Sequence, residues 1–148
     1  MKFPQARYRE IYNGFILNDA KHACENVRKI LKIIENAVGL SSDQYFDVRI
    51  ILSELLQNAI KHGNEKGKQS KVFMNVFIKN GNVLSITVKD QGSGFNAKKT
   101  LQDELNNQVR DVQELAECGR GLCIIKNLCD KMIFNRRGNC ITVLKKLV

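Results

Sequence analysis

Hydrophobic residues recur along the chain with two different periods, one typical of helices and one typical of strands. Residues 6–17, which are rich in aromatic and β-branched types, predict an opening strand. A helix is then predicted up to Gly39, with Asn18 or Asp19 as its N-cap. The apolar residues at helical spacing, which predict its buried face, are Ala23, Val27, Ile30, Leu31, Ile34 and Val38.

A second helix is predicted to run up to about Gly63, because Ser41 and Gln44 have the spacing of a capping box. Glu54 and Asn58 lie one turn apart on this helix, roughly 100° around from its apolar stripe. We therefore expect both at the margin of the core, where a side chain can face a cleft. The stripe itself consists of Val48, Leu52, Leu55 and Ala59.

The pattern then changes to period two, which predicts strands. Two apolar runs within residues 71–90 are joined by Asn80-Gly81, a strong hairpin signal. A third helix is predicted over residues 121–130, and a second hairpin, turning near residues 138–139, closes the chain. Helices and mainly antiparallel strands in separate blocks predict an α+β fold, a two-layer α/β sandwich.

Residues 95–118 are mixed and polar, with a short helix predicted over residues 111–117. An irregular connection of this length is uncommon inside a compact domain and is usually functional. We therefore interpret this segment as a candidate lid over a binding site.

The length of 148 residues fits one domain, residues 1–148, and the composition is that of a globular protein. Neither a membrane-spanning run nor a signal peptide is recognisable, so a soluble, cytoplasmic protein is expected. The five cysteines show no CxxC spacing and are expected to be free thiols. The net charge of +9 is scattered over the chain, which suits a solvated surface, or an acidic protein or nucleotide partner, at least as well as nucleic acid.

Three segments carry candidate chemistry, and each one alone also has a plain structural explanation. Glu54 and Asn58 could simply pair on a solvated helix flank. Asp90 ends a predicted strand in VKDQGSGFN, where a carboxylate can accept hydrogen bonds from an exocyclic amine such as that of adenine. Gly92 and Gly94 would let the backbone approach a flat ligand, although Asp-Gly turns are common.

The third segment is CGRGLCIIKNLCD, in which Gly119 and Gly121 lead into the third helix. Backbone N–H groups at the start of a helix bind anions, typically phosphate. Arg120 could add positive charge there or point to water, and Leu122 begins the buried face of the helix. A loop that needs glycine only to turn would have the same sequence.

Taken together and in this order, the three segments resemble the GHKL ATPase superfamily. The closer resemblance is to its stand-alone anti-sigma-factor serine/threonine kinases of the RsbW and SpoIIAB type. SELLQNAIKHGN is similar to the E-x-x-x-N-A-x-x-H-G signature, and VKDQGSGFN to D-x-G-x-G-F. GRGLCIIKNLCD is similar to G-R-G-L-x-x-I-x-x-L-x-D, and the likeness covers nearly the whole chain. It implies the Bergerat-type fold, a mainly antiparallel mixed sheet with helices on one face.

The resemblance implies a role for each matching position. Glu54 would be the general base, Asn58 would give its amide oxygen to Mg²⁺, and Asp90 would bind the adenine amine of ATP. His62 belongs to the signature, and only a supporting or capping role is expected for it. The residues implied to make room for the base or to hold the phosphates are Gly92, Gly94, Gly119, Arg120, Gly121 and Leu122.

The implied function is an ATP–Mg²⁺-dependent serine/threonine protein kinase. It would phosphorylate an anti-anti-sigma partner with a STAS domain, sequester a sigma factor and form a homodimer, with no direct contact to nucleic acid or membrane. One alternative is a nucleotide-dependent binding module without phosphotransfer, which would have no need of Glu54 as a base. A histidine-kinase ATPase domain is a further alternative, although no phosphoacceptor hairpin precedes the motifs after Met1. The positive charge is the main support for a nucleic-acid-binding protein.

Overall fold

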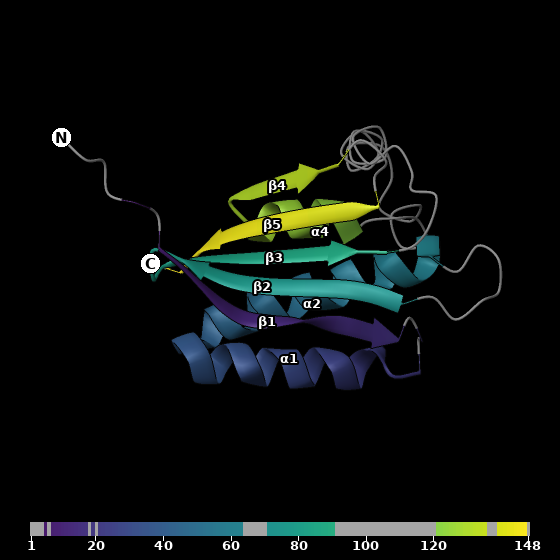
Figure 1. Ribbon diagram of the computed structural model, residues 1–148, viewed down its shortest axis with the longest axis horizontal. Coiled ribbons are helices and arrows are strands. Elements are labelled where there is room, and N and C mark those ends of the chain that lie inside the picture. Colours follow the sequence, from purple (N-terminus) through teal and green to yellow (C-terminus); the bar gives the residue numbers. More distant parts are fainter. Residues whose placement is uncertain are drawn as a thin grey trace.

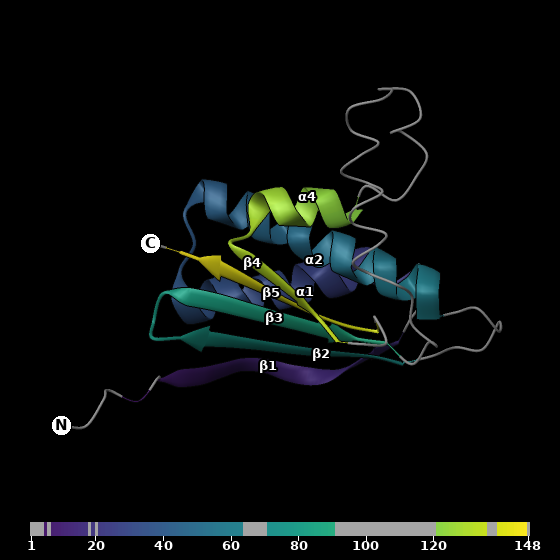
Figure 2. The ribbon, with the colours of Figure 1, turned by 90° about the horizontal axis from the view of Figure 1, so that it is seen from above.

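The computed structural model describes residues 5, 7–17, 19, 21–63, 71–90, 121–135 and 139–147. Its strands form one sheet in the order β1-β2-β3-β5-β4, and the four recorded pairings are antiparallel. The described helices lie on one face of this sheet, which is the two-layer α+β sandwich predicted above (Figures 1 and 2). The elements are β1 (Tyr8–Leu17), α1 (Ala23–Val38), α2 (Ser42–Gly63), β2 (Lys71–Lys79), β3 (Val83–Lys89), α4 (Gly121–Leu128), β4 (Lys131–Phe134) and β5 (Cys140–Lys146).

The start of α1 differs from the prediction. The helix begins at Ala23, with His22 in the N-cap position, so an N-cap at residue 18 or 19 is wrong. The Asp19 carboxylate instead accepts hydrogen bonds from the Lys21 backbone N–H and the His22 ring, both at 2.8 Å. An aspartate that bonds to the backbone two residues further on forms a local turn, and this turn competes with helix initiation. The C-terminal stop at Gly39 is confirmed, because this residue has a φ of 65°, in the left-handed region that favours glycine.

The capping box at the start of α2 is confirmed. The Ser41 N–H donates to Gln44 Oε1 at 2.9 Å, and the Gln44 N–H donates to Ser41 Oγ at 3.2 Å. These reciprocal bonds satisfy two of the backbone donors that the start of a helix leaves without partners. The helix then continues to Gly63, as predicted.

The core lies between the sheet and the helices. On α1, Val27, Ile30, Leu31 and Ile34 are buried as predicted, whereas Ala23 and Val38 are only half-buried. Val48, Leu52, Leu55 and Ala59 are all buried and form the stripe of α2. The β2–β3 hairpin turns at Asn80 and Gly81, which have φ values of 52° and 76°. The inward-facing hairpin residues, all buried, are Val72, Met74, Val76, Ile78, Leu84, Ile86 and Val88.

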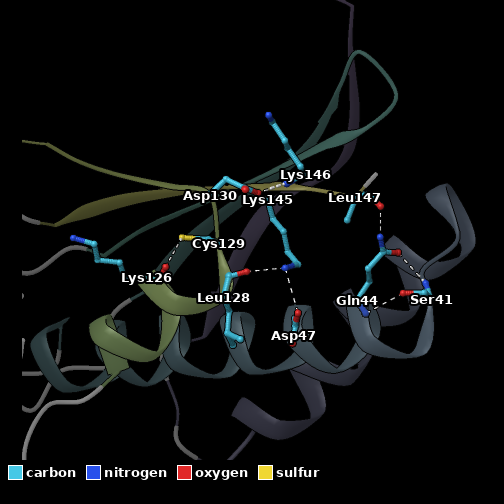
Figure 3. Close-up of polar contacts among 10 residues, drawn as sticks. All are labelled: Ser41, Gln44, Asp47, Lys126, Leu128, Cys129, Asp130, Lys145, Lys146 and Leu147. Carbon is cyan, nitrogen blue, oxygen red and sulfur yellow. Dashed lines mark hydrogen bonds and ion pairs between the residues drawn. The ribbon is translucent and has the colours of Figure 1, made fainter. Parts of the chain in front are cut away.

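Polar contacts tie the last strand to two helices (Figure 3). Lys145 Nζ donates to the Leu128 carbonyl oxygen, at the end of α4, at 2.6 Å, and to Asp47 Oδ2 of α2 at 3.3 Å. Near the start of α2, the Gln44 side-chain amide donates to the Leu147 carbonyl oxygen. These contacts hold α4 and α2 to the last strand, β5, and to the residue that follows it.

Two further expectations concern the described residues only. Cys24, Cys123, Cys129 and Cys140 are free thiols, as predicted. No helix within the described ranges is long and apolar enough to span a bilayer.

Candidate functional site

The first and third sequence motifs meet where α2 and α4 pack together. A Cβ atom built on Gly121, the first residue of α4, would lie 2.7 Å from Glu54 Oε2. The same position is 3.5 Å from Asn58 Nδ2 and 3.6 Å from Asn58 Oδ1. The lack of a side chain at Gly121 therefore lets the backbone of α4 approach both polar groups of α2.

Packing of the two helices produces this approach. The apolar stripe of α2 anchors that helix in the core and leaves Glu54 and Asn58 half-buried at its margin. Leu122 and Ile125 of α4 are also buried, which brings the start of α4 against the polar edge of α2. Burial of the Leu122 side chain means that only its backbone is left for contact with a ligand.

Glu54 is the carboxylate of this edge. Partial burial raises the pKa of its carboxyl group, because a low-dielectric setting disfavours the charged form. A carboxylate with a raised pKa is a better proton acceptor near neutral pH than an ordinary surface glutamate. The position therefore suits a general base.

Asn58 has an unsatisfied amide. Its Nδ2 atom is buried and has no hydrogen-bond partner among the described residues. Buried polar groups are normally hydrogen-bonded. A buried side-chain amide without a partner, next to the space that Gly121 leaves free, is therefore suited to contact a ligand. The two ends of an asparagine amide differ only by a flip, so its oxygen can equally face this space.

The chemistry of this donor set suits magnesium bound together with phosphates. Mg²⁺ prefers oxygen ligands and takes several of them from water and substrate phosphates. Within the described ranges, no group of three or more His, Cys, Asp or Glu residues could hold a metal ion. A metal ion bound by Asn58 would therefore need further oxygen ligands that the described residues do not supply, such as those of water and substrate phosphates.

Asp90, the key residue of the second motif, follows β3 and is only 7% exposed. Its backbone N–H donates to the Asn139 carbonyl oxygen at 2.9 Å, and its own carbonyl oxygen accepts from Asn139 Nδ2 at 3.4 Å. Figures 1 and 2 place the end of β3, the second half of α2 and the start of α4 at the same end of the molecule. All three motifs thus reach one end of the sandwich.

Asn135 and Asn139 were not singled out from the sequence as candidate site residues. Asn135 Nδ2 donates to Asn139 Oδ1 at 2.6 Å, and Asn135 Oδ1 accepts from the Cys140 N–H at 3.2 Å. This pair of amides holds the end of β4 and the start of β5 beside Asp90. Both asparagines flank the predicted turn of the second hairpin, where asparagine is an ordinary residue, so the sequence offered no signal that set these two apart.

Several predicted site residues lie outside the described residues: Gly92, Gly94, Gly119, Arg120 and the candidate lid at residues 95–118. His62 belongs to α2, but only its backbone is described. A cavity of about 330 Å³ lies elsewhere, lined by residues such as Arg9, Val38 and Gly81, and it includes none of the predicted site residues.

Comparisons with known proteins show what the chain as a whole is similar to. The chain is 28% identical over 122 residues to the serine-protein kinase RsbW of Staphylococcus epidermidis, covering 80% of this chain and 76% of the relative. It is 29% identical over 108 residues to the anti-sigma F factor of Geobacillus sp. (strain WCH70), covering 72% of this chain and 71% of the relative. The RsbW kinase of Bacillus subtilis is 26% identical over 123 residues, or 82% of this chain and 76% of the relative. Residues 18–145 match the family described as histidine kinase-like ATPase domain, and the chain belongs to that family.

Proposed function

We propose that this protein is an ATP- and Mg²⁺-dependent serine/threonine protein kinase that acts as an anti-sigma factor. The observation that carries the proposal is the meeting of Glu54, Asn58 and Gly121. It places a carboxylate of raised pKa and an unpaired amide beside the start of a helix. The names of the relatives, serine-protein kinase and anti-sigma F factor, support the same function.

In this proposal each residue has one task. Glu54 accepts the proton of the attacking serine or threonine hydroxyl. Asn58 holds Mg²⁺ through its amide oxygen, and the ion supplies charge neutralisation at the phosphates. Asp90 accepts a hydrogen bond from the adenine amine. The start of α4 presents backbone N–H groups to the phosphates, with Gly121 leaving room for them.

The rest of the proposed site comes from residues outside the described ranges. Gly92 and Gly94 make room for the base, Gly119 and Arg120 complete the phosphate-binding turn, and residues 95–118 close over the nucleotide. Phosphoryl transfer depends mainly on positioning and charge stabilisation, so closure of such a segment would exclude water from the reacting groups.

We also propose the biological setting that the relatives suggest. The substrate would be a serine or threonine of an anti-anti-sigma protein with a STAS domain, and the sequestered partner would be a sigma factor. The protein would act in the cytoplasm as a homodimer of single-domain chains, residues 1–148. Nucleic acid would then be reached only through the sigma factor.

The test is incubation of the purified protein with labelled ATP, Mg²⁺ and candidate STAS-domain proteins from the same genome. Label on a serine or threonine is the expected result. Glu54→Gln should still bind ATP but lose transfer by ~10²–10⁴-fold, the usual contribution of a positioned base. Asn58→Ala should lose the dependence on Mg²⁺ or nucleotide binding itself.

Gln57→Ala is the matched control, because this exposed residue lies on the same helix between the two site residues. It should transfer phosphate at the wild-type rate. Transfer by Glu54→Gln at the wild-type rate would remove Glu54 from the role of base. ATP binding without transfer to any partner would favour a nucleotide-dependent binding module.

A further inference from the structure

The described helices lie on one face of the sheet, and Figure 2 shows the other face turned away from them. We call this second face the open face. Strand register and alternating burial define its members, because directly paired residues of antiparallel strands share a face. Its described side chains include Tyr8, Glu10 and Phe15 of β1 and Phe73 and Phe77 of β2.

The open face is strongly positively charged. Within the described strands, its outward-facing positions hold five lysines and one acidic residue, Glu10. The open face therefore accounts for part of the +9 net charge that looks scattered along the sequence. The five lysines, of which Lys79 is half-buried and the others exposed, are Lys71, Lys79, Lys89, Lys131 and Lys146.

Large apolar side chains are exposed among these lysines. Phe15 is 66% exposed and Tyr8 is 63% exposed. The Phe15 ring packs against Phe73, with the centroids 5.4 Å apart. The outer face of an antiparallel sheet is usually polar, so exposed aromatic rings within a charged surface mark an interaction site.

We propose that the open face binds an acidic protein segment that also carries apolar side chains. Its carboxylates would pair with the lysines, and its apolar side chains would cover Phe15 and Tyr8. This surface is separate from the proposed nucleotide site and adds a partner-binding function to it. Aromatic anchors surrounded by charged residues are the usual anatomy of a protein–protein interface.

Charge and ring packing favour this occupant over others. A second copy bound through the same face would bring lysines against lysines. Single-stranded nucleic acid binds by stacking bases on free aromatic faces. Here lysine ammonium groups already lie over the rings, Lys71 Nζ 6.0 Å from the Phe15 centroid and Lys79 Nζ 5.8 Å from the Tyr8 centroid.

The probe is a short synthetic peptide in which Glu alternates with Leu and Phe, and its binding is measured by fluorescence anisotropy. Two matched peptides replace either all Glu by Gln or all Leu and Phe by Ser. The parent peptide should bind tightest, and each replacement should weaken binding by about tenfold, because charge and apolar contact both contribute. Equal binding of all three peptides would overturn the proposal.

Variants locate the surface. The triple change Lys89→Gln, Lys131→Gln and Lys146→Gln should weaken binding by about tenfold. The control variant replaces three exposed lysines of the helices by glutamine, which removes the same amount of charge, and it should leave binding unchanged. These control residues are Lys29, Lys32 and Lys126.

Phe15→Ser tests the aromatic part in the same way, and Phe46→Ser is its control. Phe46 lies on α2, off the open face, and is 60% exposed, close to the 66% of Phe15. Thermal unfolding of each variant verifies that it is folded. Equal losses in the open-face variants and their controls would overturn the proposal. So would tighter binding of oligothymidine or phosphatidylglycerol vesicles than of the parent peptide, or self-association that Phe15→Ser abolishes.

Discussion

Glu54 sits where the protein disfavours its negative charge. Burial raises the pKa of this carboxyl group above its ordinary value of 4.5, so the ionised form lowers the stability of the folded protein at neutral pH. The stability that the group contributes is fully present below pH 4.5 and is lost as the pH rises through the raised pKa. Such a cost is common at functional sites.

Glu54→Gln should therefore raise the thermal unfolding midpoint at pH 7 to 8, because glutamine carries no charge to bury. The gain should shrink as the pH falls through the raised pKa and disappear below pH 4.5, where the wild-type carboxyl group is neutral in both folded and unfolded protein. Thermal unfolding across this pH range checks the prediction. Glu25→Gln is the control: Glu25 is exposed in the first turn of α1, and its loss should give no gain. A gain for Glu54→Gln that is the same at every pH would contradict the burial argument.

Gly121→Ala should separate folding from function. The added Cβ would lie 2.7 Å from Glu54 Oε2, the end of a flexible side chain, so the carboxylate can move and the fold should survive. Alanine also loses less backbone freedom on folding than glycine does. We expect an unchanged or higher unfolding midpoint together with phosphotransfer at least about tenfold slower, because a displaced base loses its alignment.

Gly14→Ala is the control for this variant, since its new Cβ would meet only the end of the Tyr12 side chain, within 3.1 Å of the hydroxyl oxygen. It should leave phosphotransfer unchanged. Wild-type transfer by Gly121→Ala would mean that the position of Glu54 does not matter for the reaction.

At the scale of elements, Lys145 joins β5 to the end of α4 and to α2. Its side chain is only 13% exposed. Lys145→Met would keep the apolar stem but leave the Leu128 carbonyl oxygen and the Asp47 carboxylate without this donor. We expect a loss of ~1–3 kcal/mol in the free energy of unfolding, measured by denaturant titration.

The neighbouring Lys146 provides the control, because its side chain is exposed and faces the other side of the sheet. Lys146→Met should change stability by less than about 0.5 kcal/mol. Equal losses in both variants would show that the contacts of Lys145 with α2 and the end of α4 do not stabilise the fold.

Local signals predicted most elements well. The capping box at Ser41, the Asn80-Gly81 turn and the stop at Gly39 each depend on residues close together in the sequence, and each is found in the structure. The start of α1 was predicted wrongly because two local signals compete there. Asp19 can cap a helix or close a turn, and its bonds to Lys21 and His22 close the turn.

At the scale of the whole molecule, the sequence indicated that the site residues form one site, but the only basis for this was the order of the three motifs. Periodicity placed Glu54 and Asn58 on one helix edge, but no local pattern relates that edge to Gly121, which is more than sixty residues away. The helix packing that joins them is a property of the folded core. The amide pair of Asn135 and Asn139 is a local contact across the β4–β5 turn, but its position beside Asp90 exists only when β3 and β5 are paired, so the sequence did not reveal it as part of the site.

The central claim is that the three motifs surround one nucleotide. The most direct measurement is a titration with ADP and Mg²⁺ followed by two-dimensional nuclear magnetic resonance of the isotope-labelled protein. Three signals report on the three motifs: the side-chain amide of Asn58 and the backbone amides of Asp90 and Gly121. The Asn82 amide, in the hairpin turn at the other end of β3, is the reference.

The account predicts that all three signals shift with one common dissociation constant while the Asn82 signal stays in place. A nucleotide that leaves any of the three unmoved, or moves them with different midpoints, would contradict it.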